Sequence, residues 1–445
     1  MVEDDYVIRV LKSPQDITAL EWDTLLATQP HPSPFMRHAY LAAMHASGSA
    51  TSKTGWTPRF LTLWRGKTLC AACALYLKTH SYGEYVFDWA WADAYQRHGI
   101  AYYPKALIAP PFTPVPGSRL LARDAAARAA LVRSLVAWCS EEELSSLHLL
   151  FVGEEDAAAC AEAGFMMRHN VQFHWTNVAP TLGTGVSSLP PEGERPALGR
   201  PGGGTVAPTL GAHLSARPFK DFDEFLASLA QEKRKKIRQE RRKVSEAGVH
   251  FRWSEGRAIS QEDWNFFYSC YERTYYEHGN APYLTRDFFQ RMADAMPENW
   301  LLFIAERGSG TNSTPIACSL IALSSSSGPG APDCNGLAER VAYGRYWGAL
   351  ERVDCLHFEA CYYQPLEWCI ANGYTRFEGG AQGEHKMARA LMPVRTTSAH
   401  WLAHPAFADA VERFLEREGQ GIAQYMDDLA QRTPFRHEAA APVPE

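Results

Sequence analysis

The segment Ser146-Leu-His-Leu-Leu-Phe-Val152 decides the fold, because an apolar run of this length is typical of a buried β-strand. A polar loop follows it, then a helical segment at 156–164 and a second strand-like run at 165–175. An amphipathic helix is predicted ahead of it at 124–143. The predicted order of elements is therefore helix, strand, helix, strand.

The same order recurs in the second half of the chain. Tyr374-Thr-Arg-Phe-Glu378 is predicted as a strand, a short helix is expected near 384–391, and a further strand at 396–402. A helix at roughly 355–372 precedes them. Strands that alternate with helices, twice over, predict two similar α/β domains.

The length of 445 residues agrees with two domains of about 150–200 residues each. Between them, residues 179–216 contain eight Gly, six Pro and no aromatic residue, which predicts a disordered linker or insertion. We therefore expect an N-terminal domain at 1–178, the linker at 179–216, a C-terminal domain at 217–435, and a flexible tail at 436–445.

Composition excludes several classes of protein. The formal net charge of −6 gives no overall attraction to nucleic acid or anionic lipid. No stretch reaches the roughly 18 apolar residues of a membrane span, and the acidic N-terminus is unlike a secretory signal, so a cytoplasmic protein is expected. Ten cysteines are too few for a disulfide scaffold. Cys70 and Cys73 lie in the run 68–77, predicted as one buried strand, where they would point to opposite faces.

Three segments are richer in polar and aromatic side chains than packing requires. The first, at 80–105, includes residues that we expect to line a polar cleft with aromatic walls: Asp88, Trp91, Asp93, Tyr95 and Lys105. In the alternative interpretation these aromatic side chains cover the core and use their polar ends for hydrogen bonds.

The second segment is a predicted helix with eight basic residues between positions 233 and 243. Arg238 and Arg241 are candidates for contacts with the phosphates of a nucleotide, a cofactor or an RNA. A simple solvated helix face is the alternative.

The third segment surrounds a pair of glycines at 379–380, which would let backbone amides approach a ligand. Glu378 or His385 could deprotonate an amine, and Lys386, Arg389 and Arg345 could bind phosphate or carboxylate. The other binding candidates in this part of the chain are Tyr343, Trp347, His357, Glu359, Tyr363, Gln382 and Glu384.

Other motifs fail on their spacing. The glycines at 379–383 lack the Lys-Ser/Thr of a P-loop, and no G-x-G-x-x-G follows a strand. His357-x-Glu359 lacks the Pro-Cys-x-x-Cys of a zinc deaminase, and no G-x-S-x-G is present. We expect no metal site, no serine nucleophile and no covalently bound cofactor.

Several of these segments together resemble one family, the FemAB-like predicted N-acyltransferases, which are related to GNAT enzymes and to peptidoglycan biosynthesis/recognition proteins. The segments are 81–95, 102–105, 172–175, 233–244, 343–348, 357–364 and 377–386. The resemblance covers roughly 30–178 and 217–420 and implies an α/β fold with two tandem GNAT-like domains, each built on a mixed sheet.

The resemblance also implies an activity. Such enzymes transfer an acyl or aminoacyl group from an activated donor, acyl-CoA or aminoacyl-tRNA, to an amine such as that of a cell-wall precursor or peptide. Arg345-Tyr-Trp-Gly348-Ala-Leu350 departs from the CoA-binding pattern of GNAT enzymes, which leaves both donors open. By position in the family, Lys386 would stabilise the transferred group electrostatically, with Glu378 or His385 as the base, in a catalytic C-terminal domain. The alternative is a non-catalytic binder of a peptidoglycan precursor or nucleic acid, through the helix at 233–243 and the aromatic cleft.

Overall fold

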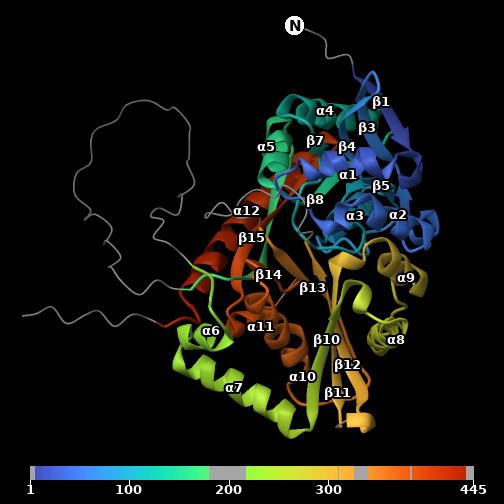
Figure 1. Ribbon diagram of the computed structural model, residues 1–445. Coiled ribbons are helices and arrows are strands. Elements are labelled where there is room, and N and C mark those ends of the chain that lie inside the picture. The colour runs from blue at the N-terminus through green and yellow to red at the C-terminus, as the bar shows by residue number, and fades with distance from the viewer. Residues whose placement is uncertain (1–5, 180–216, 309, 325–338, 381–382, 437–445) are drawn as a thin grey trace, which may run out of the picture.

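The computed structural model describes residues 6–179, 217–308, 310–324, 339–380 and 383–436 (Figure 1). Most of the predicted linker and tail lies outside these residues, as does Gln382.

A large mixed sheet runs through the whole molecule (Figure 1). Among the described residues it has eleven strands, in the order β10 (Val249–Glu255), β11 (Trp300–Arg307), β12 (Thr314–Leu323), β13 (Val341–Ala349), β14 (Arg376–Glu378), β9 (Met166–Thr176), β15 (Met392–Leu402), β8 (Ser146–Val152), β6 (Lys105–Ile108), β5 (Leu75–Lys78) and β2 (Trp56–Pro58). A smaller sheet has the order β1 (Val7–Leu11), β3 (Phe60–Arg65), β4 (Thr68–Cys73) and β7 (Leu121–Ala122). The predicted mixed-sheet α/β class is confirmed.

The two halves of the chain exchange their last strands. β9, from the first half, pairs with β14 of the second half, and β15, from the second half, lies between β9 and β8. On either side of this exchange stands a parallel pair, β6 with β8 and β13 with β14. The predicted repeat is therefore present as two similar half-sheets, and each is completed by the final strand of the other. The domain boundary predicted at residue 178 falls just after the exchanged strand β9.

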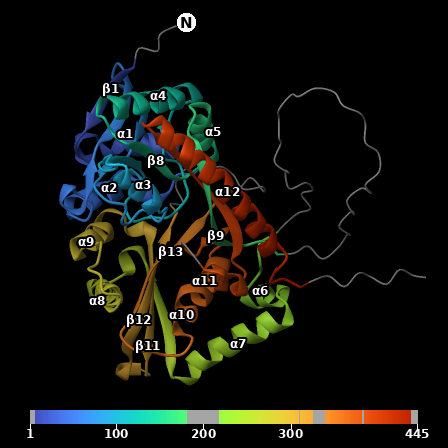
Figure 2. The same ribbon diagram turned by 180° about the vertical axis from the view of Figure 1, so that it is seen from behind.

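Helices cover both faces of the sheet (Figures 1 and 2). Those of the first half are α1 (Ala19–Ala27), α2 (His38–Ala46), α3 (Trp89–Arg97), α4 (Ala125–Glu141) and α5 (Glu154–Glu162). Those of the second half are α6 (Phe222–Ser228), α7 (Gln231–Glu246), α8 (Gln261–Glu277), α9 (Arg286–Ala295), α10 (Leu356–Phe358), a π-helix (Glu359–Tyr363), α11 (Gln364–Ala371), a 3-10 helix (Glu384–Arg389) and α12 (Pro405–Ala430). α12 lies along the exchanged strands β9 and β15 (Figure 2).

The expectation of one strand at 68–77 is wrong. β4 ends at Cys73 and β5 begins at Leu75, and the two strands belong to different sheets. The buried residue Ala74 lies at the crossing from the small sheet to the large one. A run that is buried on both faces has the pattern of one continuous apolar strand, so the crossing between the two sheets leaves no mark in the hydrophobic pattern.

α8 packs directly on the backbone of β13. A Cβ atom added to Gly348 would lie 2.3 Å from the carbonyl oxygen of Cys270, which belongs to α8. Gly348 is thus required for the close approach of helix and strand.

We therefore predict that Gly348→Ala lowers the free energy of unfolding by about 1–3 kcal/mol, because the methyl group forces the helix away from the strand. Gly421→Ala is the matched control: Gly421 is exposed on α12 with open space around it, and alanine should stabilise that helix by about 0.5–1 kcal/mol. Chemical denaturation of the two variants measures both effects, and equal stabilities would contradict the prediction.

Candidate functional site

The sheet opens where β13 and β14 part. The parallel pairing covers only Val341–Tyr343 against Arg376–Glu378. β13 then continues to Ala349, so within the described residues this edge of β13 has no strand partner beyond Tyr343. The register against β12 also shifts here, with Leu320 opposite Tyr346 and Ile321 opposite Gly344. The bulge and the short β14 leave an opening in the middle of the sheet, a common place for a site.

A cavity of about 1190 Å³ lies over one face of the sheet beside this opening. Tyr343, Glu378 and His174 line it from β13, β14 and β9, and residues 30–34 and 116–117 line it from the first half. Successive side chains of β9 point to opposite faces of the sheet. Gln172 and His174 therefore face the cavity side, while Phe173 and Trp175 pack into the core on the opposite face. The cavity is therefore built jointly by the two halves.

Glu378 and His174 form a buried polar pair in this cavity. Both side chains are more than nine-tenths buried, and His174 Nε2 lies 3.9 Å from Glu378 Oε2. Arg376 Nε donates to Glu378 Oε1 at 3.2 Å, whereas Oε2 accepts no hydrogen bond from the described residues. Burial lowers the pKa of His174, and Glu378 only partly opposes this effect.

Lys386 lies on the opposite face. Met387 of the same 3-10 helix and Leu391, just after it, pack into the core cluster that contains Phe173 and Phe377. Lys386 is 4% exposed, and its amine donates to the carbonyl oxygen of Gly380 at 2.9 Å. It has no carboxylate partner among the described residues, and burial lowers its pKa to about 8.

The neighbouring His385 is exposed, and its Nε2 lies 3.4 Å from the Tyr362 hydroxyl. His357 is also exposed and makes an edge contact with the ring of Trp347, at 5.4 Å between centroids. These side chains gather around the π-helix at 359–363, beside Lys386. π-Helical turns of this kind are frequent at functional sites.

Several predicted ligand-binding residues instead hold α7 in place. Arg389 Nη2 donates to Glu240 at 3.0 Å, and the Tyr363 hydroxyl donates to the same carboxylate. Arg241 donates to Glu359 at 3.1 Å from Nε, and Arg241 Nη2 also reaches a surface glutamate of α11. These contacts tie the basic helix α7 to the π-helix, to α11 and to the 3-10 helix that carries Arg389. Arg238 remains exposed, with no ion pair among the described residues.

Arg345 and Glu384, the remaining candidates of the second half, contact other parts of the molecule. Arg345 Nη2 donates to the carbonyl oxygen of Phe112, and its guanidinium lies over the ring of Phe35, so it points toward the first half. Glu384 accepts from the Tyr425 hydroxyl at 2.8 Å.

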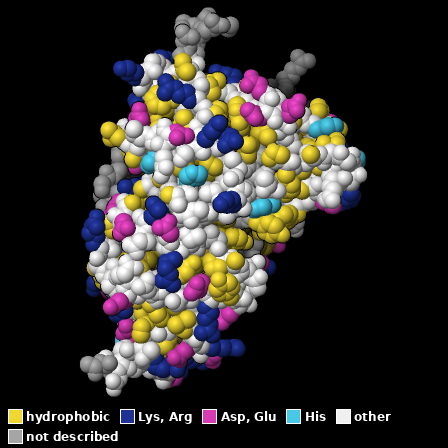
Figure 3. Space-filling view, turned by 90° about the vertical axis from the view of Figure 1, so that its right-hand side faces the viewer, with side chains coloured by type: hydrophobic (Ala, Val, Ile, Leu, Met, Phe, Trp, Pro, Cys, Tyr) yellow, Lys and Arg dark blue, Asp and Glu magenta, His cyan; other side chains and the backbone are white. Residues whose placement is uncertain are grey.

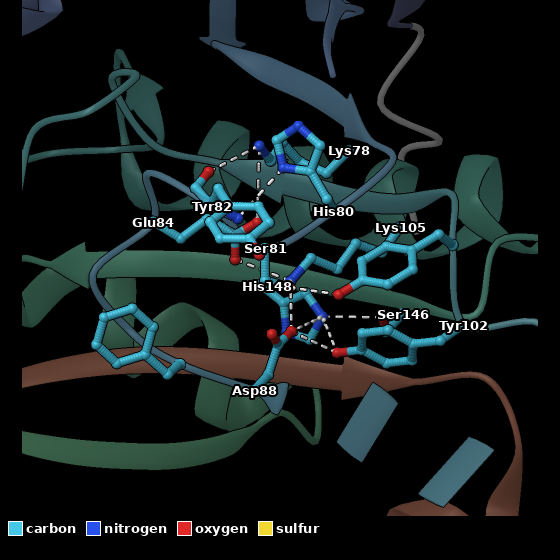
Figure 4. Close-up of polar contacts among 12 residues, drawn as sticks. Lys78, His80, Ser81, Tyr82, Glu84, Asp88, Tyr102, Lys105, Ser146 and His148 are labelled. Carbon is cyan, nitrogen blue, oxygen red and sulfur yellow. Dashed lines mark hydrogen bonds and ion pairs between the residues drawn. The ribbon is translucent and has the colours of Figure 1, made fainter. Parts of the chain in front are cut away.

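In the first half, Lys105 is the centre of a buried ionic cluster (Figure 4). Its amine donates to Ser81 Oγ and Glu84 Oε2, both at 2.8 Å, and to Asp88. The Tyr102 hydroxyl donates to Asp88 Oδ2 at 2.6 Å. Burial alone would lower the pKa of Lys105, but the two carboxylates raise it. The cluster fixes the loop before α3.

The other candidates of the first half lie partly in the core and partly on the surface. Trp91 and Tyr95 are buried between α3 and α12, where Tyr95 stacks on Phe407 at 4.0 Å between centroids. Asp93 is exposed and pairs with Arg97 one turn later. None of these residues lines the cavity of 1190 Å³.

Gln172, His174 and Arg376 were not among the sequence-based candidates. A signal existed, since Gln172-Phe-His-Trp175 alternates polar and apolar residues inside a buried strand. This pattern alone could not show that His174 lies beside Glu378, because β14, the partner of that strand, is about 200 residues away in the chain. In the described part of the chain, no helix is long and apolar enough to cross a membrane. No cluster of three or more metal-binding side chains was found there either.

Comparisons with known proteins give one family. The model of the FemAB-like family, described as peptidoglycan biosynthesis/recognition, matches residues 13–180 and 207–437. No curated protein matches the chain. Among solved structures, FemX is 11% identical with a TM-score of 0.49, covering 89% of this chain and 98% of its own. L-PGS from Bacillus licheniformis is 9% identical with a TM-score of 0.48, covering 89% and 97%. A tandem GNAT protein from the clavulanic acid biosynthesis pathway is 11% identical with a TM-score of 0.41, covering 90% and 99%.

The two buried lysines should respond oppositely to replacement. Lys105→Met leaves Glu84 and Asp88 buried without their cation, so we expect a loss of about 3–5 kcal/mol in unfolding free energy. Arg97→Met, which breaks the exposed pair with Asp93, should cost less than about 1 kcal/mol. Denaturant unfolding compares them, and similar losses would show that the cluster does not hold the loop.

Lys386→Met should instead stabilise the fold at pH 7, by up to about 3 kcal/mol, because it removes an unpaired buried cation. The folded pKa of about 8 lies below the unfolded value of 10.5. Between these pH values only the unfolded chain holds the proton, so the stability of the unaltered protein should rise with pH relative to the variant. Unfolding curves at pH 7, 9 and 10.5 test this, and a pH-independent difference would contradict it.

Proposed function

Because the chain belongs to the FemAB-like family of peptidoglycan biosynthesis/recognition proteins, we propose that it is an N-acyltransferase. It joins an activated acyl or aminoacyl group to the amine of a peptide-like acceptor. The reaction needs removal of a proton from the amine, stabilisation of the oxyanion that forms on the acyl carbon, and positioning of both substrates. It needs no nucleophile from the protein.

The observation that carries the proposal is the buried Lys386 amine at the opening between β13 and β14. A cation with no carboxylate partner among the described residues is costly to bury, and such groups concentrate at functional sites. With a pKa of about 8 it is mostly protonated at pH 7. Held away from water, it can stabilise the oxyanion of the transition state.

The two substrates approach from opposite faces of the sheet. The acceptor amine occupies the cavity that ends at Glu378, and the donor lies on the Lys386 face, beside the π-helix and α7. The reacting atoms meet at the end of β14, where the sheet is open.

We further propose aminoacyl-tRNA as the donor rather than acyl-CoA. On α7 the side chains of Lys235, Lys236 and Arg238 are exposed and unpaired within the described residues, in a protein of net charge −6. On the face shown in Figure 3, by contrast, basic and acidic side chains are interspersed. A local row of cations suits a polyanionic nucleic acid.

We predict that Lys386→Met lowers the transfer rate about 10²–10³-fold, since one oxyanion-stabilising group is lost. Lys386→Arg should retain more activity because it keeps the charge. The assay supplies acetyl-CoA or a mixture of charged tRNAs as donor, and amino-acid and peptide amines as acceptors. The rate of the unaltered enzyme should fall above pH about 8, where Lys386 loses its proton.

Lys67→Met, in the exposed turn between β3 and β4, is the control and should transfer at the normal rate. Wild-type turnover by Lys386→Met would contradict the assignment of the site. Binding of a donor without any transfer would favour the non-catalytic binder.

For the donor, we predict that Lys235→Glu with Arg238→Glu weakens tRNA binding and reduces the salt dependence of the affinity, because phosphate contacts are lost. Lys67→Glu with Arg133→Glu makes the same change of charge on exposed residues of the first half and should leave binding unchanged. Filter binding at several salt concentrations measures both. Stabilisation by acetyl-CoA, with no effect of the α7 substitutions on tRNA, would favour the CoA donor.

A further inference from the structure

We infer that the Glu378–His174 pair is the subsite for the acceptor's primary amine, with Glu378 Oε2 holding the ammonium and His174 Nδ1 taking its proton. This inference rests on the proposed function and names a base that the sequence did not indicate.

Only one carboxylate oxygen of Glu378, Oε2, is available to bind a cationic ligand. Arg376 occupies Oε1, while Oε2 is buried, lines the cavity side and accepts no hydrogen bond from the described residues. A buried carboxylate oxygen without a donor is unfavourable unless a ligand supplies one. A primary ammonium can donate to Oε2 and still offer a proton to a second acceptor.

The hydrogen bonds of Gln172 determine which nitrogen of His174 is that acceptor. Gln172 Nε2 donates to the carbonyl oxygen of Pro114 at 2.9 Å, so the other end of the amide, Oε1, faces His174. Oε1 only accepts, and it lies 3.2 Å from His174 Nε2. The neutral imidazole therefore carries its hydrogen on Nε2, which leaves the lone pair on Nδ1.

The groups around His174 keep it neutral until it takes a proton. Arg376 from β14 and Lys386 from the 3-10 helix add to burial in lowering its pKa, and Glu378 opposes them. Once protonated at Nδ1, the ring would be an imidazolium 3.9 Å from the Glu378 carboxylate. The same carboxylate thus binds the substrate cation and then stabilises the product cation.

The proton and electron balance is simple. The ammonium gives one proton to His174 Nδ1 and becomes a neutral amine. Its lone pair forms the C–N bond as the acyl–oxygen bond of the aminoacyl ester breaks, and the second amine proton leaves with the departing hydroxyl group. His174 then releases its proton to solvent.

The rest of the cavity indicates the kind of chain that bears the amine. Arg395 lines it, is exposed and has no ion pair among the described residues, and Thr396 and Thr397 add hydroxyl groups. A volume of about 1190 Å³ greatly exceeds a simple alkylamine. The acceptor is accordingly an amine on an amino-acid or peptide chain that also carries a carboxylate.

The first test is kinetic. With charged tRNA as donor and glycylglycine or Nα-acetyl-lysine as acceptor, His174→Gln should lower the transfer rate 10²–10⁴-fold and remove the fall in rate at acidic pH. Glutamine can still donate to Gln172, so the local hydrogen bond is kept. Imidazole in the buffer should partly restore the activity of His174→Ala.

His250→Gln is the matched control. His250 Nε2 lies 3.3 Å from Glu306 Oε2, a similar pair that stands outside the cavity. This variant should keep the normal rate and pH profile. An unchanged acidic limb in His174→Gln, or no rescue by imidazole, would overturn the inference while leaving the acyltransferase proposal standing.

The second test needs no turnover. With ¹⁵N-histidine in the full chain, the signals absent from His174→Gln should report a neutral ring with hydrogen on Nε2 at pH 7. They should shift on addition of Nα-acetyl-lysine and stay unmoved with Nα,Nε-diacetyl-lysine, which has no amine. A hydrogen on Nδ1, or equal shifts with both probes, would contradict the inference. Absence of transfer from every donor, with the amine-specific shift retained, would overturn the proposed function alone.

Discussion

The exchange of final strands between the two halves is the constraint on which the rest of the structure depends. β9 is hydrogen-bonded to β14, and β15 to both β9 and β8, so neither half-sheet is complete without a strand of the other. The exchange also brings His174 of the first half opposite Glu378 of the second. The proposed amine subsite and the continuity of the sheet therefore depend on the same backbone pairing.

Two buried lysines show how the molecule treats charge in different places. Lys105 is fully enclosed, with Glu84, Asp88 and Ser81 as hydrogen-bond partners, and its charge is retained. Lys386 is almost as buried, yet its amine donates to one backbone carbonyl. The first arrangement satisfies a cation to fix a loop. The second leaves a cation with a single backbone acceptor among the described residues, an arrangement that suits the oxyanion-stabilising role proposed for Lys386.

Local patterns in the sequence predicted the α/β class, the repeated order of elements and the helices near 124–143, 156–164 and 355–372, since each depends on periodicity within one segment. They also directed attention to Lys386 and Glu378, which the structure places at the opened sheet. They could not place Arg345 against Phe112 or find the contacts of Arg241 and Arg389 with buried carboxylates. Those contacts join segments more than a hundred residues apart in the sequence. In addition, a basic or aromatic residue has the same local sequence pattern whether it binds a ligand or another helix.

The division of the proposed site between two faces follows from the alternation of side chains along β14. Phe377 and Glu378 are adjacent, and alternation sends one into the core beside Lys386 and the other into the cavity. A Cβ atom on Gly379 would lie 2.5 Å from Leu391 Cδ2 and 3.5 Å from Lys386 Cδ, so no side chain fits between strand and lysine. Gly380, at φ +80°, turns its carbonyl toward the Lys386 amine. Among the described residues, one strand and two glycines separate the proposed amine subsite from the proposed oxyanion cation, which suits a reaction that joins substrates entering from opposite sides.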